Sequence, residues 1–180
     1  MTRRALLGIS AAAGASAAAG LATVPLGVLR TAAAATEASS LAPLLGAEHW
    51  LGRRPDAASL RGKVVLVDVF TFDCINCKHV IPSLRAFHAH GESGLALLGI
   101  HTPETPFERE LPHVQAAFAA QGIVWPVAID NDSALWRAYG IEYWPTQLIF
   151  DRKGRLRSTV VGEGEDRSVA STIAALLAER

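Results

Sequence analysis

The chain has 180 residues and two cysteines, Cys74 and Cys77, which lie in the stretch FTFDCINCK at residues 70–78. An apolar run at residues 63–70 precedes them and predicts a buried β-strand, and a helical pattern follows them. A thiol placed where a strand ends and a helix begins lies at the helix N-terminus, where unpaired N–H groups and the helix dipole stabilise a thiolate. We therefore predict that Cys74 is a nucleophile and that Cys77, one helical turn later, is the thiol that closes a disulfide with it.

Other uses of two thiols at this spacing differ in the neighbours they require. Covalent haem attachment needs a histidine directly after the second cysteine, and Lys78 stands there. A structural zinc site needs two further ligands, and the histidines of the chain show no paired spacing. A structural disulfide across so short a loop would stabilise little. A copper chaperone with the two thiols and a histidine as soft ligands stays open as an alternative.

A thiol peroxidase is the second alternative that stays open. Thr71 and Cys74 have the T-x-x-C spacing of peroxiredoxins. Val67 stands where that family places a proline, and a C-x-x-C motif is foreign to most of its members. Thiol:disulfide exchange is therefore the first interpretation and peroxide reduction the second.

The first 35 residues differ in composition from the rest of the chain. Residues 1–35 contain the adjacent arginines Arg3 and Arg4, then an uncharged, apolar stretch at residues 5–29, and then an alanine run at 32–35. This is the layout of a twin-arginine-type export signal, with an uncleaved membrane anchor as the less favoured interpretation. We expect a periplasmic or otherwise extracytoplasmic protein. The 17 Lys and Arg balance 17 Asp and Glu, so we expect no nucleic-acid partner.

The remaining sequence predicts a lead-in segment, residues 36–59, and one α/β domain, residues 60–180. Little regular structure beyond an edge strand or hairpin is expected in the lead-in. Strands are predicted at residues 63–70, 95–101, 124–129, 146–150 and 156–161, and helices after the cysteines to about residue 90, at 112–121, before Gly140 and at 166–178. This order predicts a central mixed sheet with helices on both faces.

Separate features around the cysteines lie at the offsets found in thioredoxin-fold proteins. Asp68 precedes Cys74 by six residues, where thioredoxins carry a buried acid. Pro82 follows Cys77 by five residues, where they carry a proline that kinks the helix. An acid within a Val/Leu strand is costly to bury, which favours a functional acid over an ion pair.

Further motifs narrow the resemblance to the extracytoplasmic thioredoxin-like domains of the TlpA and DipZ type. Trp144-Pro145-Thr146 resembles the cis-proline loop, and residues 151–154 resemble the hairpin after it. The stretches that resemble the DipZ type are CINC at 74–77, HTPE at 101–104, AIDND at 128–132, WRAYG at 136–140 and GEGE at 162–165. The extra helix and strand before the cis-proline loop fit the insert of the TlpA type.

This resemblance implies a thioredoxin fold and a role for each matching residue. Cys74 would attack the disulfide of a partner and Cys77 would resolve the mixed disulfide, while Asp68 relays a proton through water. Pro145, held cis, would lie against the two sulfurs, and the backbone of Trp144 would pair with the bound chain. Substrate contacts are also expected of the residues before the first cysteine, Phe72 and Asp73.

The expected partners follow from the same resemblance. Protein disulfides are the expected substrates, and a membrane electron donor of the CcdA or DsbD type would recharge the pair, in the setting of cytochrome c biogenesis or a related pathway. No cofactor beyond the Cys74–Cys77 couple and no metal is expected. The carboxylate of Asp73 opposes thiolate formation at Cys74, and Lys78 partly offsets it, so we expect a reductant rather than an oxidant.

Overall fold

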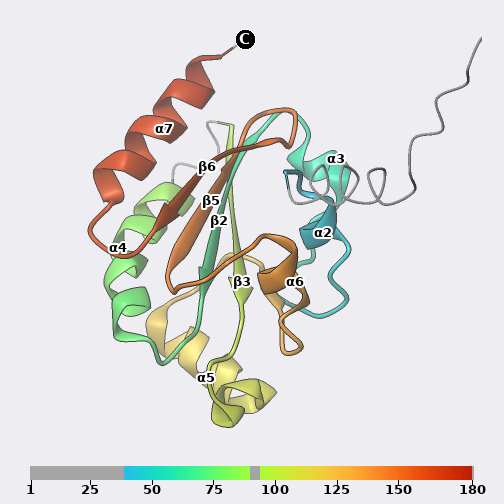
Figure 1. The fold of residues 1–180 in the computed structure, drawn as a ribbon, viewed down its shortest axis with the longest axis vertical. Helices are drawn as coiled ribbons and strands as arrows, with labels where there is room; N and C mark the ends of the chain where they lie inside the picture. The colour runs from blue at the N-terminus through green and yellow to red at the C-terminus, as the bar shows by residue number, and fades with distance from the viewer. Residues whose placement is uncertain (1–38, 90–93, 180) are drawn as a thin grey trace, which may run out of the picture.

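One mixed sheet of six strands organises the chain. The computed structural model describes residues 39–89 and 94–179, so the expected export signal lies outside the described residues. The strands stand in the order β1-β4-β3-β2-β5-β6 (Figure 1). Their bounds are Trp50–Leu51 (β1), Val64–Phe70 (β2), Leu95–His101 (β3), Val127–Ile129 (β4), Thr146–Phe150 (β5) and Leu156–Val161 (β6). β2, β3 and β4 run parallel, and the other neighbouring pairs are antiparallel, as a mixed sheet requires.

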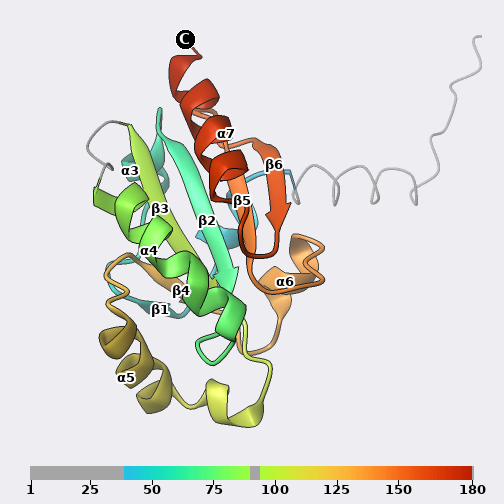
Figure 2. The ribbon, with the colours of Figure 1, turned by 90° about the vertical axis from the view of Figure 1, so that its left-hand side faces the viewer.

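Helices cover both faces of this sheet, as predicted (Figures 1 and 2). One face carries α4 (Ile75–Ala89) and α7 (Asp166–Ala178), with α5 (Leu111–Gln121) packed into the same core. The other face carries α2 (Ala42–Leu45), α3 (Ala57–Leu60) and α6 (Ala134–Ala138). A short 3₁₀ helix, η2 (Pro106–Arg109), joins β3 to α5.

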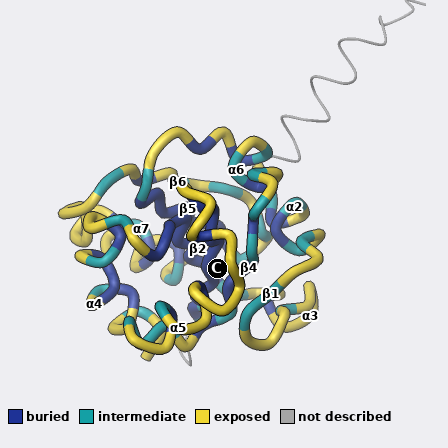
Figure 3. The backbone as a smooth tube through the Cα atoms, turned by 90° about the horizontal axis from the view of Figure 1, so that it is seen from below, coloured by how far each residue is buried: buried dark blue, intermediate teal, exposed yellow. Residues whose placement is uncertain are grey.

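The central strand β2 is buried on both faces, and its side chains alternate between two cores. Val64, Leu66 and Phe70 pack in the core beneath α4, α5 and α7, while Val65 and Val67 pack in the core beneath α2 and α6. Viewed from below, the buried residues gather in the central strands and the exposed ones at the periphery (Figure 3). By this alternation Asp68 belongs to the face covered by α4.

The third parallel strand is shorter than predicted. β4 begins at Val127, three residues after Val124, whose side chain is 71 % exposed. Pro126 precedes the strand and has no N–H to donate to a neighbouring strand. Hydrophobic residues before the proline therefore belong to the loop.

The lead-in segment contains the expected edge strand, β1, but also two short helices that its composition does not predict. Leu44 in α2 is fully buried, and its backbone N–H donates to the Tyr139 hydroxyl at 3.2 Å. Residues from 41 onward therefore complete the core beneath α6. No helix within residues 39–89 and 94–179 is long and apolar enough to cross a membrane.

Candidate active site

Cys74 lies directly before the first residue of α4, as predicted. Its side chain is partly exposed, whereas Cys77 is 2 % exposed. The backbone N–H of Cys77 donates to the Cys74 sulfur at 3.4 Å. No disulfide joins the two sulfurs in this structure. The helix N-terminus thus presents one reachable sulfur and keeps the other covered.

The covered thiol is held in its protonated form. Burial raises the pKa of Cys77, and the hydrogen bond with Cys74 and the nearby charge of Asp68 raise it further. A hydrogen bond from the backbone of Thr71 acts in the opposite direction. Cys77 therefore needs a proton acceptor before it can attack a mixed disulfide.

Asp68 is placed to be that acceptor. It is 2 % exposed in the middle of β2 and accepts a hydrogen bond from the Gln147 amide, with 2.9 Å between Nε2 and Oδ1. Burial raises the pKa of Asp68 to about 7, and the bond from Gln147 opposes that rise. A carboxyl with this pKa can accept and return a proton near neutral pH.

The connector between β2 and α4, residues 71–73, is held by side chains of the insert. The carboxylate of Glu108 in η2 accepts the Thr71 hydroxyl and, at 3.3 Å, the Asp73 backbone N–H. The Phe72 carbonyl accepts from Gln121 Nε2 in α5 at 2.8 Å. All three residues before Cys74 are thus fixed from outside the strand and helix that they join.

Glu108 is 1 % exposed and ionised among these donors. Its second oxygen accepts the backbone N–H groups of Glu104 and Thr105 at 2.9 and 2.7 Å, and the bond from Thr105 belongs to a capping box at the start of η2. Burial raises the pKa of Glu108, but the hydrogen bonds from Thr71, Thr105 and Asp73 outweigh it and leave the pKa below its usual value.

Beside this carboxylate, His101 is fully buried and stacks on Phe72 with ring centroids 5.6 Å apart. Burial lowers the pKa of His101 to about 4, against the opposing charge of Glu108. The imidazole is therefore neutral at physiological pH and packs as part of the core under the connector.

Glu108→Gln is expected to lower the free energy of unfolding by about 1–3 kcal/mol, because an amide NH₂ would face N–H donors in place of one acceptor oxygen. Urea denaturation of the reduced protein measures this loss. The matched control is Glu104→Gln, whose exposed side chain predicts a change within about 0.5 kcal/mol. Equal losses in the two variants would contradict the anchoring role of Glu108.

The loop before β5 meets the end of β2 beside the connector. The Trp144–Pro145 peptide bond is cis, and Pro145 is buried. Thr146 pairs with Val69, so continuing this antiparallel register places Pro145 opposite Phe70. The backbone N–H and C=O of Trp144 have no hydrogen-bond partner among the described residues. The predicted cis bond is present, and the residue before Pro145 has a backbone donor and acceptor without partners in the described part of the chain.

The other predicted substrate contacts differ in accessibility. Asp73 is exposed and forms an ion pair with Lys78, with 3.0 Å between Oδ1 and Nζ, so the cation expected to offset its charge does contact it. The Phe72 side chain is only 6 % exposed and stacks on the buried His101 ring. Its ring packs in the core beneath α4 rather than at the surface.

Sequence reasoning did not single out Glu108, Gln121 or Gln147 as parts of the site. For Gln147 a signal exists, since it is a polar residue within the apolar strand TQLIF, the pattern that drew attention to Asp68. For Glu108 and Gln121 the signal is weak, because both lie on polar surfaces of helical patterns and reach the connector only through the tertiary fold.

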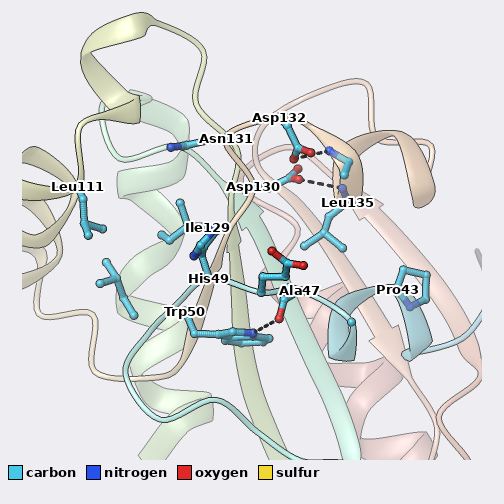
Figure 4. A pocket seen from close by; sticks show the side chains of 14 residues that line it. Pro43, Ala47, His49, Trp50, Leu111, Ile129, Asp130, Asn131, Asp132 and Leu135 are labelled. Atoms are coloured by element: carbon cyan, nitrogen blue, oxygen red, sulfur yellow. Dashed lines mark hydrogen bonds between the residues drawn. The ribbon is translucent and has the colours of Figure 1, made fainter.

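A cavity of about 810 Å³ lies over β1 and β4, on the side of α2 and α6 (Figure 4). Its central polar groups are already engaged. Asp130 accepts the backbone N–H groups of Leu135 and Trp136, and Trp50 donates to the Ala47 carbonyl. Neither cysteine lines it, so the chemistry is assigned to the thiols rather than to this cavity. Within the described part of the chain, no three His, Cys, Asp or Glu side chains gather as metal ligands do.

Comparison with known proteins shows the family of the chain. The Redoxin family model matches residues 52–176. The chain is 42 % identical over 147 residues to Protein DipZ of Mycobacterium bovis, which covers 78 % of this chain and 21 % of DipZ. It is 26 % identical over 137 residues to the thiol-disulfide oxidoreductase YkuV of Bacillus subtilis, covering 76 % of this chain and 93 % of that protein. The chain thus spans about a fifth of the DipZ proteins it matches.

Solved structures show the same fold. The crystal structure of a thiol-disulfide isomerase from Corynebacterium glutamicum superposes with a TM-score of 0.67 at 27 % identity, covering 74 % of this chain and 94 % of the isomerase. The predicted thioredoxin-like fold is confirmed. The resemblance to the DipZ type, carried by short motifs in the sequence, is confirmed as well.

Proposed function

Since this chain belongs to the Redoxin family and has the thioredoxin-like fold, we propose that it is a thiol:disulfide oxidoreductase that works as a reductant on protein disulfides outside the cytoplasm. The single observation that supports this most is the arrangement of three groups: a reachable Cys74, a covered Cys77 that donates to it, and a buried Asp68 beneath them. The relatives named as thiol-disulfide oxidoreductase and isomerase are similar over most of the domain.

The reaction follows from the unequal exposure of the two sulfurs. The Cys74 thiolate attacks one sulfur of the partner disulfide and forms a mixed disulfide, and the other partner sulfur leaves as a thiolate that takes up a proton. Cys77 then gives its proton to Asp68 and attacks the Cys74 sulfur, which forms the Cys74–Cys77 disulfide and releases the second partner thiolate. The partner gains two electrons and the dithiol loses two.

Substrate binding is assigned to the surface around Cys74. The unpaired peptide group of Trp144 supplies one donor and one acceptor for an extended chain, as in strand addition. Tyr143 precedes Trp144 and Ile75 follows Cys74 in the chain, and their side chains are 62 % and 60 % exposed, so apolar side chains of a substrate have surfaces to cover. Pro145 is proposed to form part of the same surface. Asp73 and its ion-pair partner Lys78 are proposed to lie at its edge.

Peroxide reduction is less well supported by the geometry. In the T-x-x-C interpretation the Thr71 hydroxyl would serve the reacting thiolate. Here Thr71 is fully buried and donates its hydroxyl to Glu108, away from any peroxide at Cys74. Exchange with disulfides needs no such donor.

Three further assignments belong to the proposal. Residues 1–35 are proposed to direct export through a twin-arginine-type signal. Reducing equivalents are proposed to come from a membrane donor of the CcdA or DsbD type, because a periplasmic reductant must be recharged across the membrane. The couple of two thiols is proposed to act without a further cofactor.

The test is catalysis of insulin reduction by dithiothreitol, with peroxide consumption and copper retention after dialysis measured on the same protein. We expect catalysis in the first assay alone. A reduction potential of about −270 mV, as in thioredoxin, is expected for a reductant, whereas a potential of about −120 mV, as in DsbA, would contradict the proposed direction. Peroxide turnover faster than insulin reduction would favour the peroxidase instead.

A further inference from the structure

Asp68 faces a different kind of neighbour on each side within the sheet. In β3 it stands in register with Gly99, and a Cβ there would lie 2.9 Å from Val127 Cγ2, so that position admits no side chain. In β5 it stands in register with Gln147, whose amide donates to it at 2.9 Å. Within residues 39–89 and 94–179, this is the one hydrogen bond that the Asp68 carboxyl makes.

We propose that Gln147 is a positioning residue that sets the protonation of Asp68, and through it the pH range in which Cys77 can lose its proton. This inference rests on the thiol:disulfide exchange proposed above. Gln147 is 3 % exposed and belongs to β5, so neighbouring strands fix its backbone and packing fixes its side chain. Its amide does not titrate, so it offers the same donor at every pH.

The charged and titratable groups around this pair explain why the amide matters. Cys77 lies in the first turn of α4 and interacts electrostatically with Asp68. On the other side Gln147 lines a cavity of about 10 Å³ together with Glu165 and Asp166 from the start of α7. None of the residues lining this cavity is a cation. The titratable groups placed here are acids and thiols, and the donor that favours the ionised Asp68 carboxylate is the Gln147 amide.

Removing the Gln147 donor is expected to raise the pKa of Asp68. A hydrogen bond to an ionised carboxylate favours the charged form, and burial without it favours the neutral form. In Gln147→Met, which keeps the length of the side chain, the midpoint of the acidic limb of the pH–rate profile is expected to rise by about one pH unit. Below that midpoint, kcat/KM for insulin reduction is expected to fall about tenfold, while the plateau at alkaline pH stays close to wild type.

Carbon-13 NMR titration of the Asp68 carboxyl measures the protonation of Asp68 directly. Its midpoint is expected to rise by about one unit in Gln147→Met, and Gln147→Leu supplies a second apolar variant if the first does not fold. The matched control is the Asp68→Asn background, in which Gln147→Met is expected to leave the pH profile unchanged. A merely structural role of Gln147 would move the profile equally in both backgrounds.

The NMR titration tests the inference on Gln147, and the activity assay tests the proposed function. An Asp68 midpoint that stays in place when the Gln147 amide is removed overturns this inference, whatever the activity. A protein without exchange activity whose Asp68 midpoint still shifts overturns the proposed function and leaves the control of Asp68 by Gln147 standing.

Discussion

Replacing Cys74 with serine is expected to reduce the turnover of insulin disulfides by about 1,000-fold or more, because the hydroxyl cannot supply the thiolate that begins the exchange. Cys74 is the reachable sulfur of the pair, and the first bond to the substrate forms there. Thermal unfolding of the reduced protein is expected to change little, since the side chain at this position is partly exposed. Turnover within a few-fold of wild type would rule out this mechanism.

Cys77→Ser is expected to lose turnover as Cys74→Ser does, but to accumulate a mixed disulfide with the substrate. The variant can still attack a substrate disulfide, but the mixed disulfide on Cys74 then has no second thiol to release it. Non-reducing electrophoresis with a disulfide-containing peptide is expected to show a stable adduct in Cys77→Ser and none in Cys74→Ser. Adducts of equal yield in both variants would contradict the assignment of the two roles, which rests on the burial of Cys77.

The sequence predicted most of the strands because they are apolar and continuous. β3, β5, β6 and α7 have the predicted bounds, and the position of Pro82 within α4 is confirmed. The buried helix α2 could not be predicted in this way, because a segment of four residues has no measurable periodicity. Its burial also depends on Tyr139, which lies far along the chain. Long-range packing, rather than local propensity, decides such segments.

The same division holds for the candidate site. Local spacing identified Cys74, Cys77 and Asp68, because a C-x-x-C at a helix start and an acid in an apolar strand are visible along the chain. The supporting contacts are not local: Glu108 reaches Thr71 across 37 positions of the sequence and Gln147 reaches Asp68 across 79. Only the register of the strands and the placement of the insert bring these groups together.

Asp68→Asn is expected to make the protein more stable at alkaline pH while it impairs the exchange reaction. The pKa of Asp68 is raised by burial to about 7 in the folded protein, from 3.8, so the folded state holds the proton more tightly than the unfolded chain does. Stability is therefore greatest below the unfolded pKa and is lost as the pH rises through the folded pKa. The loss above about pH 8 amounts to about 4 kcal/mol at 1.36 kcal/mol per pKa unit.

Asparagine is neutral at every pH and still accepts the bond from Gln147, so the variant escapes this loss. Urea denaturation in the presence of dithiothreitol is expected to show a gain that is small at about pH 4 and approaches about 4 kcal/mol near pH 8. Insulin reduction is expected to fall about 100-fold, because Cys77 loses its proton acceptor. A gain in stability that does not grow with pH would contradict the ionisation of Asp68 as its cause.

Asp151→Asn supplies the matched control with the opposite sign. Although burial raises the pKa of Asp151, the hydrogen bonds and charge of Arg155 and the N–H of Lys153 outweigh it and hold the pKa at about 2. This carboxylate therefore contributes stability above its unfolded pKa that disappears as the pH falls toward about 2, and its replacement is expected to cost about 2 kcal/mol at neutral pH. Two buried aspartates in one sheet protein, replaced in the same way, should thus shift stability in opposite directions, because one retains its proton in the folded state and the other gives it up.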